Sequence, residues 1–135
     1  MNKEILNKFE KIELRKLNSN TQLRQIAGKI SELPSDYIDF MSTYDGAVGF
    51  MGNNDNYLDF WTLENVNQLN PYFPGEEFSR QTIIIGSNGS GTLYGYDLIE
   101  KYFFETDEYE MDIESIKKCG NTFVDLIKYL EMKKE

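Results

Sequence analysis

Histidine is absent from this sequence of 135 residues. Imidazole is the base of Ser-His-Asp triads and a common zinc ligand, so His-based triads, His-containing metal sites and an imidazole general base are excluded. Cysteine occurs once, as Cys119, so no internal disulfide is possible. Without a histidine to activate its thiol, we expect Cys119 to be an inert small residue beside the last predicted helix, not a nucleophile.

Long apolar runs are missing as well. No window of the sequence carries the apolar core of a signal peptide or the roughly 20 apolar residues of a membrane-spanning helix. We therefore expect a cytoplasmic protein without a membrane partner.

The lysine of a nucleotide-binding loop is missing from the most glycine-rich stretch, Gly86–Thr92. Two of its glycines have P-loop spacing, but the residues that follow favour a strand, so no helix N-terminus is offered to a phosphate. Tyr94 stands where a dinucleotide-binding pattern has its third glycine. A tight turn between strands explains these glycines, and no cofactor is expected.

Basic residues are scarce beyond the first part of the chain. The net charge is −9, with seven basic and four acidic residues as far as Leu33, then seven basic and nineteen acidic residues from Pro34 onward. The negative electrostatic potential of this acidic part repels nucleic acid and anionic membranes and speeds encounter with a basic protein. The alternative is that acidity only keeps a small domain soluble.

Aromatic residues make up 14% of the chain, yet their setting is not that of a nucleic-acid binder. Such proteins interleave aromatics with Lys and Arg, whereas Asp97–Glu114 holds eight acids and one lysine. No nucleic-acid partner is expected.

The acidic residues between positions 107 and 114 lack the alternating ligands and the glycine of a calcium loop. A solvated acidic edge is favoured over any ion site, and no metal is expected. No pair of carboxylates is singled out for general acid-base chemistry. The acids considered are Asp107, Glu108, Glu110, Asp112 and Glu114.

The pattern of apolar segments predicts an α+β fold. We expect one domain over residues 1–135, with a mainly antiparallel central sheet of about four to six strands flanked by helices, because the length suits one core and no linker or repeat divides the chain. The β-branched run Ile83–Ile85 predicts a central strand buried on both faces, and the glycine turn then leads into Thr92–Tyr96 as a hairpin. Tyr57–Leu63, with Trp61 in the core, and Lys101–Glu105 complete the predicted strands.

Helices are predicted before and after these strands in the sequence, packed against the sheet. The first is amphipathic as far as about Lys16, and the second, from Thr21, carries an apolar stripe to Ile30. The third is opened by Pro34 with Ser35 as cap and closed by Tyr44-Asp45-Gly46. The last is capped by Asn121 or Thr122 with Asp125, and its stripe is Phe123, Leu126, Ile127 and Leu130. The rest is predicted to be irregular: an exposed loop over 49–56, a long connection with at most one helical turn over 64–80, an exposed loop or edge over 106–114, and a frayed tail over 131–135.

Three motifs follow one another in a distinctive order. Leu33-Pro34-Ser35-Asp36-Tyr37 leads through Phe40 to Tyr44-Asp45-Gly46; Ile85 to Gly91 is followed by Tyr94 and Tyr96-Asp97; and Asn121-Thr122-Phe123 precedes Asp125, Leu126 and Leu130. This order resembles the SUKH superfamily, which includes fungal cell-wall-assembly regulators and many bacterial immunity proteins. The resemblance covers about residues 21–130, and the stretch 64–80 matches no part of it.

The resemblance implies a non-enzymatic α+β domain that acts by protein binding. The leading hypothesis is a cytoplasmic immunity protein that neutralises a toxin, often a nuclease in this family, for which an acidic surface is complementary to a basic partner. A regulatory or scaffolding adaptor is the alternative, and an enzyme with carboxylate chemistry is a third. The oligomeric state and the identity of the toxin stay open.

We predict that the partner binds the acidic segment, defined as residues 107–112. Charge of one sign steers association, and an aromatic residue set among acids supplies the desolvated contact that charge alone does not. The predicted site consists of Asp107, Glu108, Glu110 and Asp112, with Tyr109 as the aromatic anchor.

Overall fold

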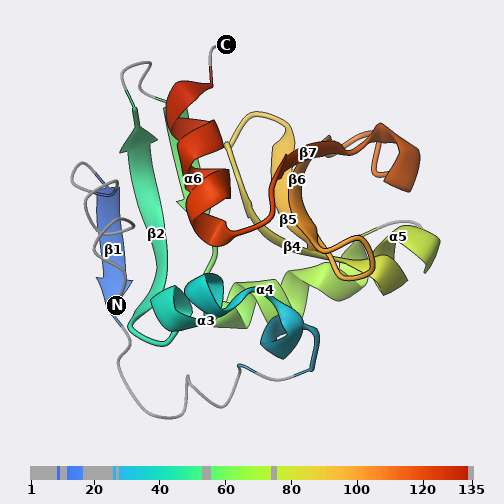
Figure 1. The fold of residues 1–135 in the computed structure, drawn as a ribbon, viewed down its shortest axis with the longest axis horizontal. Helices are drawn as coiled ribbons and strands as arrows, with labels where there is room; N and C mark the ends of the chain where they lie inside the picture. The colour runs from blue at the N-terminus through green and yellow to red at the C-terminus, as the bar shows by residue number, and fades with distance from the viewer. Residues whose placement is uncertain are drawn as a thin grey trace.

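In the part of the chain that the structure describes, seven antiparallel strands form one sheet whose order follows the chain (Figure 1). The computed structural model describes Phe9, Ile26 and residues 12–16, 28–52, 56–73 and 76–133, with only the backbone of Lys16, Tyr72 and Glu76. The strands are β1 (Ile12–Lys16), β2 (Tyr44–Met51), β3 (Asn56–Phe60), β4 (Thr82–Ser87), β5 (Thr92–Asp97), β6 (Tyr102–Asp107) and β7 (Lys117–Gly120). The predicted α+β class with an antiparallel sheet is confirmed, while the expected four to six strands are too few.

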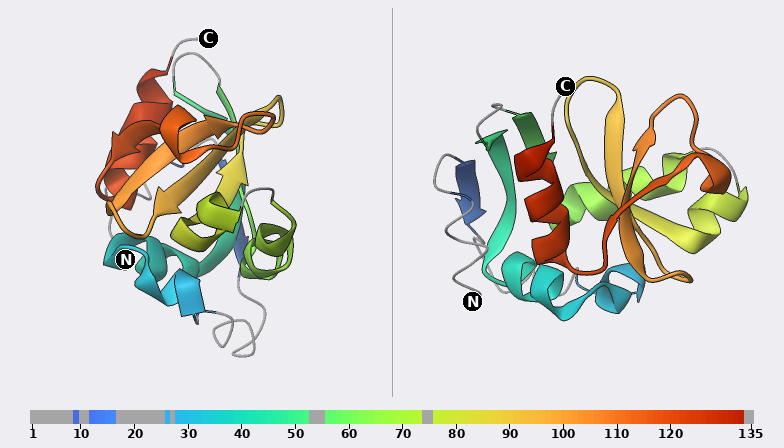
Figure 2. Two further views of the ribbon diagram at one scale, coloured as in Figure 1. Left: turned by 90° about the vertical axis from the view of Figure 1, so that its right-hand side faces the viewer. Right: turned by 45° about the horizontal axis from the view of Figure 1, so that its top comes forward.

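Helices cover both faces of this sheet. The described α-helices are α3 (Ser35–Met41), α4 (Leu63–Leu69), α5 (Glu76–Gln81) and α6 (Phe123–Met132), and the 3-10 helices are η1 (Gly28–Glu32), η2 (Asn70–Tyr72) and η3 (Ile113–Ser115). The side view in Figure 2 places α6 on one side of the strands and α4 on the other. The sheet is therefore the middle layer.

The central strand β4 is buried on both faces, as its isoleucine run predicts. Ile83 and Ile85 belong to the large core under α3 and α6, whereas Ile84 belongs to a smaller core on the opposite face. Ile84 is fully buried there with Phe78, Leu93 and Phe104. The β4–β5 hairpin is confirmed, with Ile83 opposite Tyr96.

The last helix follows its sequence signals closely. The Thr122 hydroxyl accepts a hydrogen bond from the Asp125 amide (3.1 Å), and the Asp125 carboxylate accepts one from the Thr122 amide (3.4 Å), which makes a capping box. The carboxylate of Asp36 adds two further acceptors, for the amides of Phe123 and Val124, each at 3.0 Å. Asp36, at the start of α3, thus also ties α3 to α6. The four predicted stripe residues Phe123, Leu126, Ile127 and Leu130 are all buried.

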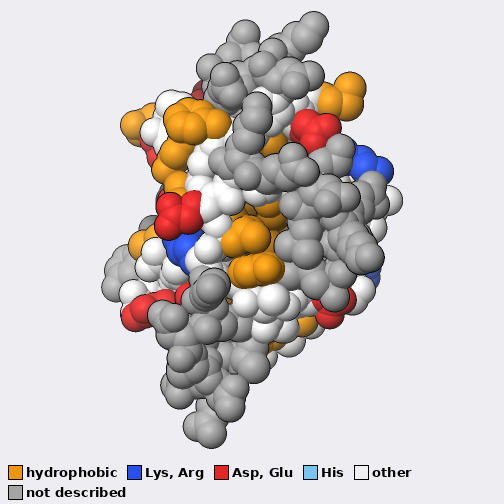
Figure 3. All heavy atoms as spheres, turned by 90° about the vertical axis from the view of Figure 1, so that its left-hand side faces the viewer, with side chains coloured by type: hydrophobic (Ala, Val, Ile, Leu, Met, Phe, Trp, Pro, Cys, Tyr) orange, Lys and Arg blue, Asp and Glu red, His pale blue; other side chains and the backbone are white. Residues whose placement is uncertain are grey.

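The prediction of helix up to Lys16 is wrong for its last part. Ile12–Lys16 is β1, which pairs with β2, and the rest of that predicted helix lies outside the described residues apart from Phe9. Phe9 and Ile12 are nevertheless buried in the large core. Hydrophobic side chains also reach the surface at the centre of the β1 side (Figure 3). The second predicted helix is described only at Ile26 and from Gly28 onward, where it is the 3-10 helix η1, with Ile30 buried.

The third helix is shorter than predicted. It ends at Met41, Pro34 is the capping position and makes no side-chain bond, and Tyr44-Asp45-Gly46 opens β2 instead of closing the helix. Gly46 has φ +86°, and a Cβ there would lie 2.3 Å from the Phe60 carbonyl oxygen. The glycine is therefore required by the close approach of β2 to β3.

Three predicted loops also need correction. Positions 49–51 continue β2, and residues 53–55 lie outside the described part of the chain. The connection 64–80 holds α4, η2 and α5, because Phe78 of α5 packs on Ile84 and Phe104. Residues 106 and 107 extend β6, and the short, charged β7 was not predicted. At the C-terminal end, α6 continues to Met132 where a frayed tail was expected.

Candidate functional site

A groove of about 810 Å³ opens on the α5 side of the sheet, beside the β4–β5 turn. Three parts of the chain form it: the segment from the end of β3 to η2, the β4–β5 hairpin, and the residues after β6. Its lining residues are Trp61, Leu69, Phe73, Ser87, Gly89, Ser90, Gly91, Leu93, Glu108, Tyr109 and Met111. We call it the hairpin groove.

Part of the lining of the hairpin groove is aromatic. The rings of Trp61 and Phe73 are stacked, with centroids 6.1 Å apart and planes 13° from parallel. The Trp61 amide donates to the Ile85 carbonyl oxygen at 2.9 Å, which fixes the chain where it leaves β3. Trp61 was predicted to be a core residue, but it is only half-buried.

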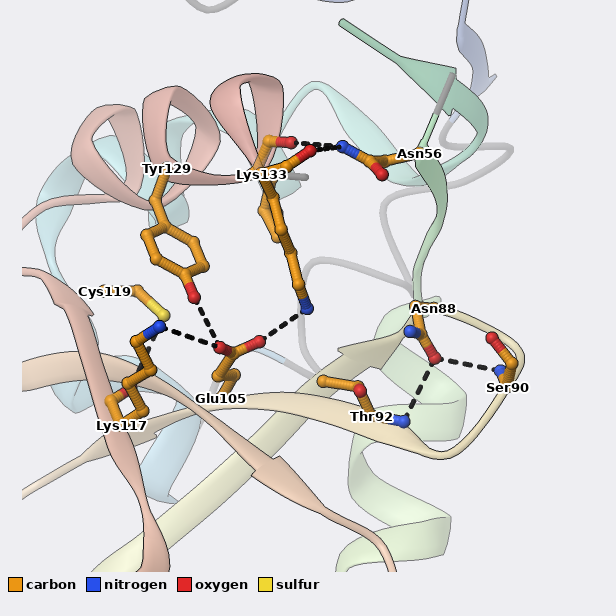
Figure 4. Close-up of polar contacts among 10 residues, drawn as sticks. Asn56, Asn88, Ser90, Thr92, Glu105, Lys117, Cys119, Tyr129 and Lys133 are labelled. Atoms are coloured by element: carbon orange, nitrogen blue, oxygen red, sulfur yellow. Dashed lines mark hydrogen bonds and ion pairs between the residues drawn. The ribbon is translucent and has the colours of Figure 1, made fainter. Parts of the chain in front are cut away.

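The β4–β5 turn forms one lip of the groove and is held by Asn88. Its side-chain oxygen accepts hydrogen bonds from the amides of Ser90 (2.9 Å) and Thr92 (3.0 Å), as Figure 4 shows. Gly89 has φ +77°, and a Cβ there would lie 3.1 Å from the Tyr57 ring. The turn residues thus have the structural role that the sequence predicts, without a helix N-terminus for a phosphate.

The acidic segment forms the adjoining lip. Glu108 and Tyr109 line the groove, and the Glu108 amide donates to the Gly91 carbonyl oxygen at 2.9 Å, which continues the β5–β6 pairing and joins the two neighbouring lips. The Tyr109 side chain is 86% exposed. The Glu108 carboxylate, as hydrogen-bond acceptor and as negative charge, raises the pKa of Tyr109, so its phenol is neutral at physiological pH.

The other predicted site residues lie beside the groove and do not line it. Asp107, Glu110 and Asp112 are exposed. The Asp107 carboxylate accepts from the Tyr109 amide at 2.8 Å, and that of Asp112 accepts from the Glu114 amide at 3.1 Å as the cap of η3. Two of the three carboxylates therefore also shape the local backbone.

Sequence reasoning missed the apolar half of the groove. The sequence patterns predict Trp61 in the core and do not point to Phe73 or Leu69. The available signal was a pair of aromatic residues set between Pro71 and Pro74. It was too weak because the groove unites segments that are far apart in the sequence.

A second cluster of polar groups centres on Glu105 and joins α6 to the sheet (Figure 4). The Glu105 carboxylate accepts from the Tyr129 hydroxyl and from Lys133 Nζ (2.7 Å), and Lys117 Nζ lies 3.8 Å away. Burial, together with the nearby Glu105 charge, raises the pKa of the Cys119 thiol to about 12. The thiol is protonated at neutral pH, which makes Cys119 a poor nucleophile.

Within the described ranges, no group of three or more His, Cys, Asp or Glu side chains is placed to hold a metal ion. In the same part of the chain, no helix is long and apolar enough to cross a membrane. Neither result points to a ligand. The hairpin groove and its acidic lip are therefore taken as the candidate site.

Comparison with known proteins supports the resemblance found in the sequence. A search of curated proteins gave no match. The family model described as the SMI1 / KNR4 family (SUKH-1) matches residues 19–128, nearly the range over which the three motifs resemble SUKH proteins. Because the match covers most of the sequence, the chain belongs to the SMI1 / KNR4 family (SUKH-1).

Proposed function

We propose that this protein is a non-enzymatic, cytoplasmic immunity protein that binds and neutralises a toxin domain. The family match carries the proposal, because the SUKH resemblance implies a domain that acts by protein binding. The uneven charge supports it: nineteen acidic residues follow Leu33, against seven basic ones. A nuclease that binds phosphate backbones is commonly basic and would be attracted to this surface.

The partner-binding site proposed here includes the acidic segment. Its acids are exposed and Tyr109 projects among them, so both the steering charge and an aromatic anchor are accessible to a partner. The exposed acids speed the encounter, whereas the aromatic contact slows dissociation.

Co-expression tests the proposal. The toxin domain encoded by a neighbouring reading frame is expressed in a bacterial host with and without this protein. We expect survival only with this protein, and a stoichiometric complex on size exclusion. If neither occurs with any toxin domain from the neighbourhood, the immunity function is wrong.

The same family match also supports a regulatory or scaffolding adaptor. That alternative predicts several unrelated cellular partners in a pull-down and no neighbouring toxin gene. If the protein were an enzyme with carboxylate chemistry, purified protein would turn over a substrate. If it depended on a cofactor, calorimetry would show tight, stoichiometric binding of ATP or zinc. We propose that neither turnover nor such binding occurs, because the chain lacks histidine and the P-loop lysine.

A further inference from the structure

We propose that the hairpin groove receives an extended segment of the partner in which an apolar or aromatic side chain is flanked by Lys or Arg. This inference rests on the proposed function, because it assumes that the chain acts by binding a protein. It moves the centre of binding from the acidic segment to the groove, where Glu108 and Tyr109 form one lip.

The first argument is the shape and chemistry of the cavity. Its volume of about 810 Å³ suits several side chains, and its lining includes the stacked Trp61–Phe73 pair. Leu69 is 40% exposed at its edge, and Tyr109 is 86% exposed. Exposed aromatic and aliphatic groups around a concave surface are typical of sites that bury an anchor side chain of a partner.

The apolar surface continues past the β4–β5 turn. Gly89 lies against the Tyr57 ring, which packs edge-on against Phe50 with centroids 5.5 Å apart. Phe50 is 52% exposed and Tyr57 is 37% exposed, although both lie in strands. The groove and this aromatic pair together fit an extended segment better than a single small molecule.

The second argument is charge. Among the described residues that line the groove there is no Lys or Arg, and Glu108 is the one acidic residue. Between Asp107 and Glu114 the sequence has five acids and no base. The neighbouring Lys117 and Lys133 face Glu105 instead. A basic segment is therefore favoured, and a nucleic-acid backbone is repelled.

The third argument is that the lips are already ordered. The Asn88 side chain holds the turn by accepting from two backbone amides, and the Glu108 amide donates to the Gly91 carbonyl oxygen, which extends the β5–β6 pairing into the adjoining lip. A groove that is held in shape before binding loses little conformational entropy when a segment enters it.

Trp61 allows a direct test, because it is the sole tryptophan of the chain and lines the groove. The probe is a short synthetic peptide with the central sequence Lys-Leu-Phe-Lys, titrated while Trp61 fluorescence is followed. The matched peptides are Glu-Leu-Phe-Glu, which reverses the charge, and Lys-Ser-Ser-Lys, which removes the apolar pair. We expect a saturable change with the first peptide and none with the other two.

Two variants locate the binding. Leu69→Lys adds a positive charge at the edge of the groove, at the last residue of α4, where lysine suits a helix. Ile99→Lys makes the same change at a side chain that is 66% exposed, in the β5–β6 turn and away from the groove. We expect Leu69→Lys to weaken binding about tenfold or more, because like charges repel, and Ile99→Lys to leave it unchanged. Tyr109→Ala, at a position that is 86% exposed, should weaken binding as well.

The outcomes separate the groove from the wider function. Lys-Leu-Phe-Lys binding that Leu69→Lys removes supports the inference. Equal binding to both lysine variants, or no binding of any peptide, overturns it, as does equal binding of all three peptides. If co-expression still protects against a toxin in that case, the proposed function stands and only the groove assignment fails.

Discussion

At the scale of single residues, the ionisation of Glu105 is coupled to the fold. Burial raises the pKa of its carboxyl, but hydrogen bonds from Lys133 and Tyr129 and the charges of Lys133 and Lys117 outweigh this, so the net pKa lies below the ordinary 4.5. A depressed pKa in the folded state means that the ionised carboxylate stabilises the fold. This contribution is complete above the unfolded-state pKa and is lost as the pH falls through the folded-state pKa.

Glu105→Gln should therefore destabilise the protein at neutral pH and have little effect in acid. Urea unfolding of both proteins at about pH 7 and about pH 3 measures the difference in unfolding free energy, which should shrink at the lower pH. Glu100→Gln, at an exposed position, is the control and should change stability little at either pH. A Glu105→Gln difference that does not vary with pH would contradict the proposed coupling.

Ile84 tests the smaller core in the same way. Its side chain is fully buried between β4 and the layer formed by α5, so Ile84→Ala should cost about 2 to 5 kcal/mol in unfolding free energy. Ile99→Ala is the matched control, because the same atoms are removed from a side chain that is 66% exposed. Similar thermal midpoints for the two variants would show that Ile84 is not a core residue.

At the scale of elements, Asn70 replaces a missing strand partner. After Phe60 the chain leaves the sheet for α4, so β3 pairs with β4 only at Ser87 and Gly86. The Asn70 side chain accepts from the Ile84 amide (2.7 Å) and donates to the Ile84 carbonyl oxygen (2.9 Å). One side-chain amide thereby satisfies two backbone groups that would otherwise lack partners beneath α4.

Asn70→Ala should lower the unfolding free energy by about 1 to 3 kcal/mol, because it leaves these backbone groups of β4 unsatisfied. Asn65→Ala, at an exposed position of α4, is the control and should leave stability nearly unchanged. Hydrogen exchange at the Ile84 amide is a more local measurement and should accelerate only in the Asn70 variant. Unchanged protection of that amide would argue against the bridge.

At the scale of the whole molecule, the uneven charge governs how a partner approaches. Converting the acids of segment 107–112 to amides should slow association with a basic partner and flatten its salt dependence. The fold should persist, because Asn at positions 107 and 112 keeps the oxygen that accepts a backbone amide. Stopped-flow mixing with the toxin domain over a range of salt concentrations measures both effects.

The matched control neutralises the same number of acids elsewhere. These are the exposed residues Glu32, Asp39, Glu77 and Glu100. If only net charge matters, both variants will associate at the same reduced rate; if segment 107–112 steers the partner, its variant will be slower. If the segment variant associates at the wild-type rate at low salt, the segment does not steer the partner and its acids only keep the surface solvated.

Local signals were sufficient for the central hairpin and for the start of the last helix. The Ile83–Ile85 run and the glycine turn predicted the buried central hairpin, and Thr122 with Asp125 predicted the start of α6. These elements agree with the sequence because burial pattern, turn chemistry and capping all lie within a few residues of one another. The same motifs, in their order, also led to the family.

Tertiary contacts decided the remainder. Ile12–Lys16 is a strand because β2 offers an edge to pair with. Position 46 lies in β2 and must be glycine, because β2 and β3 approach too closely there for a side chain. The hairpin groove depends on Trp61, Phe73 and Tyr109, which only folding brings together. The sequence by itself determined the class, the central hairpin, the charge and the family; only the folded chain decided where an apolar surface and that charge meet, because that depends on contacts between distant segments.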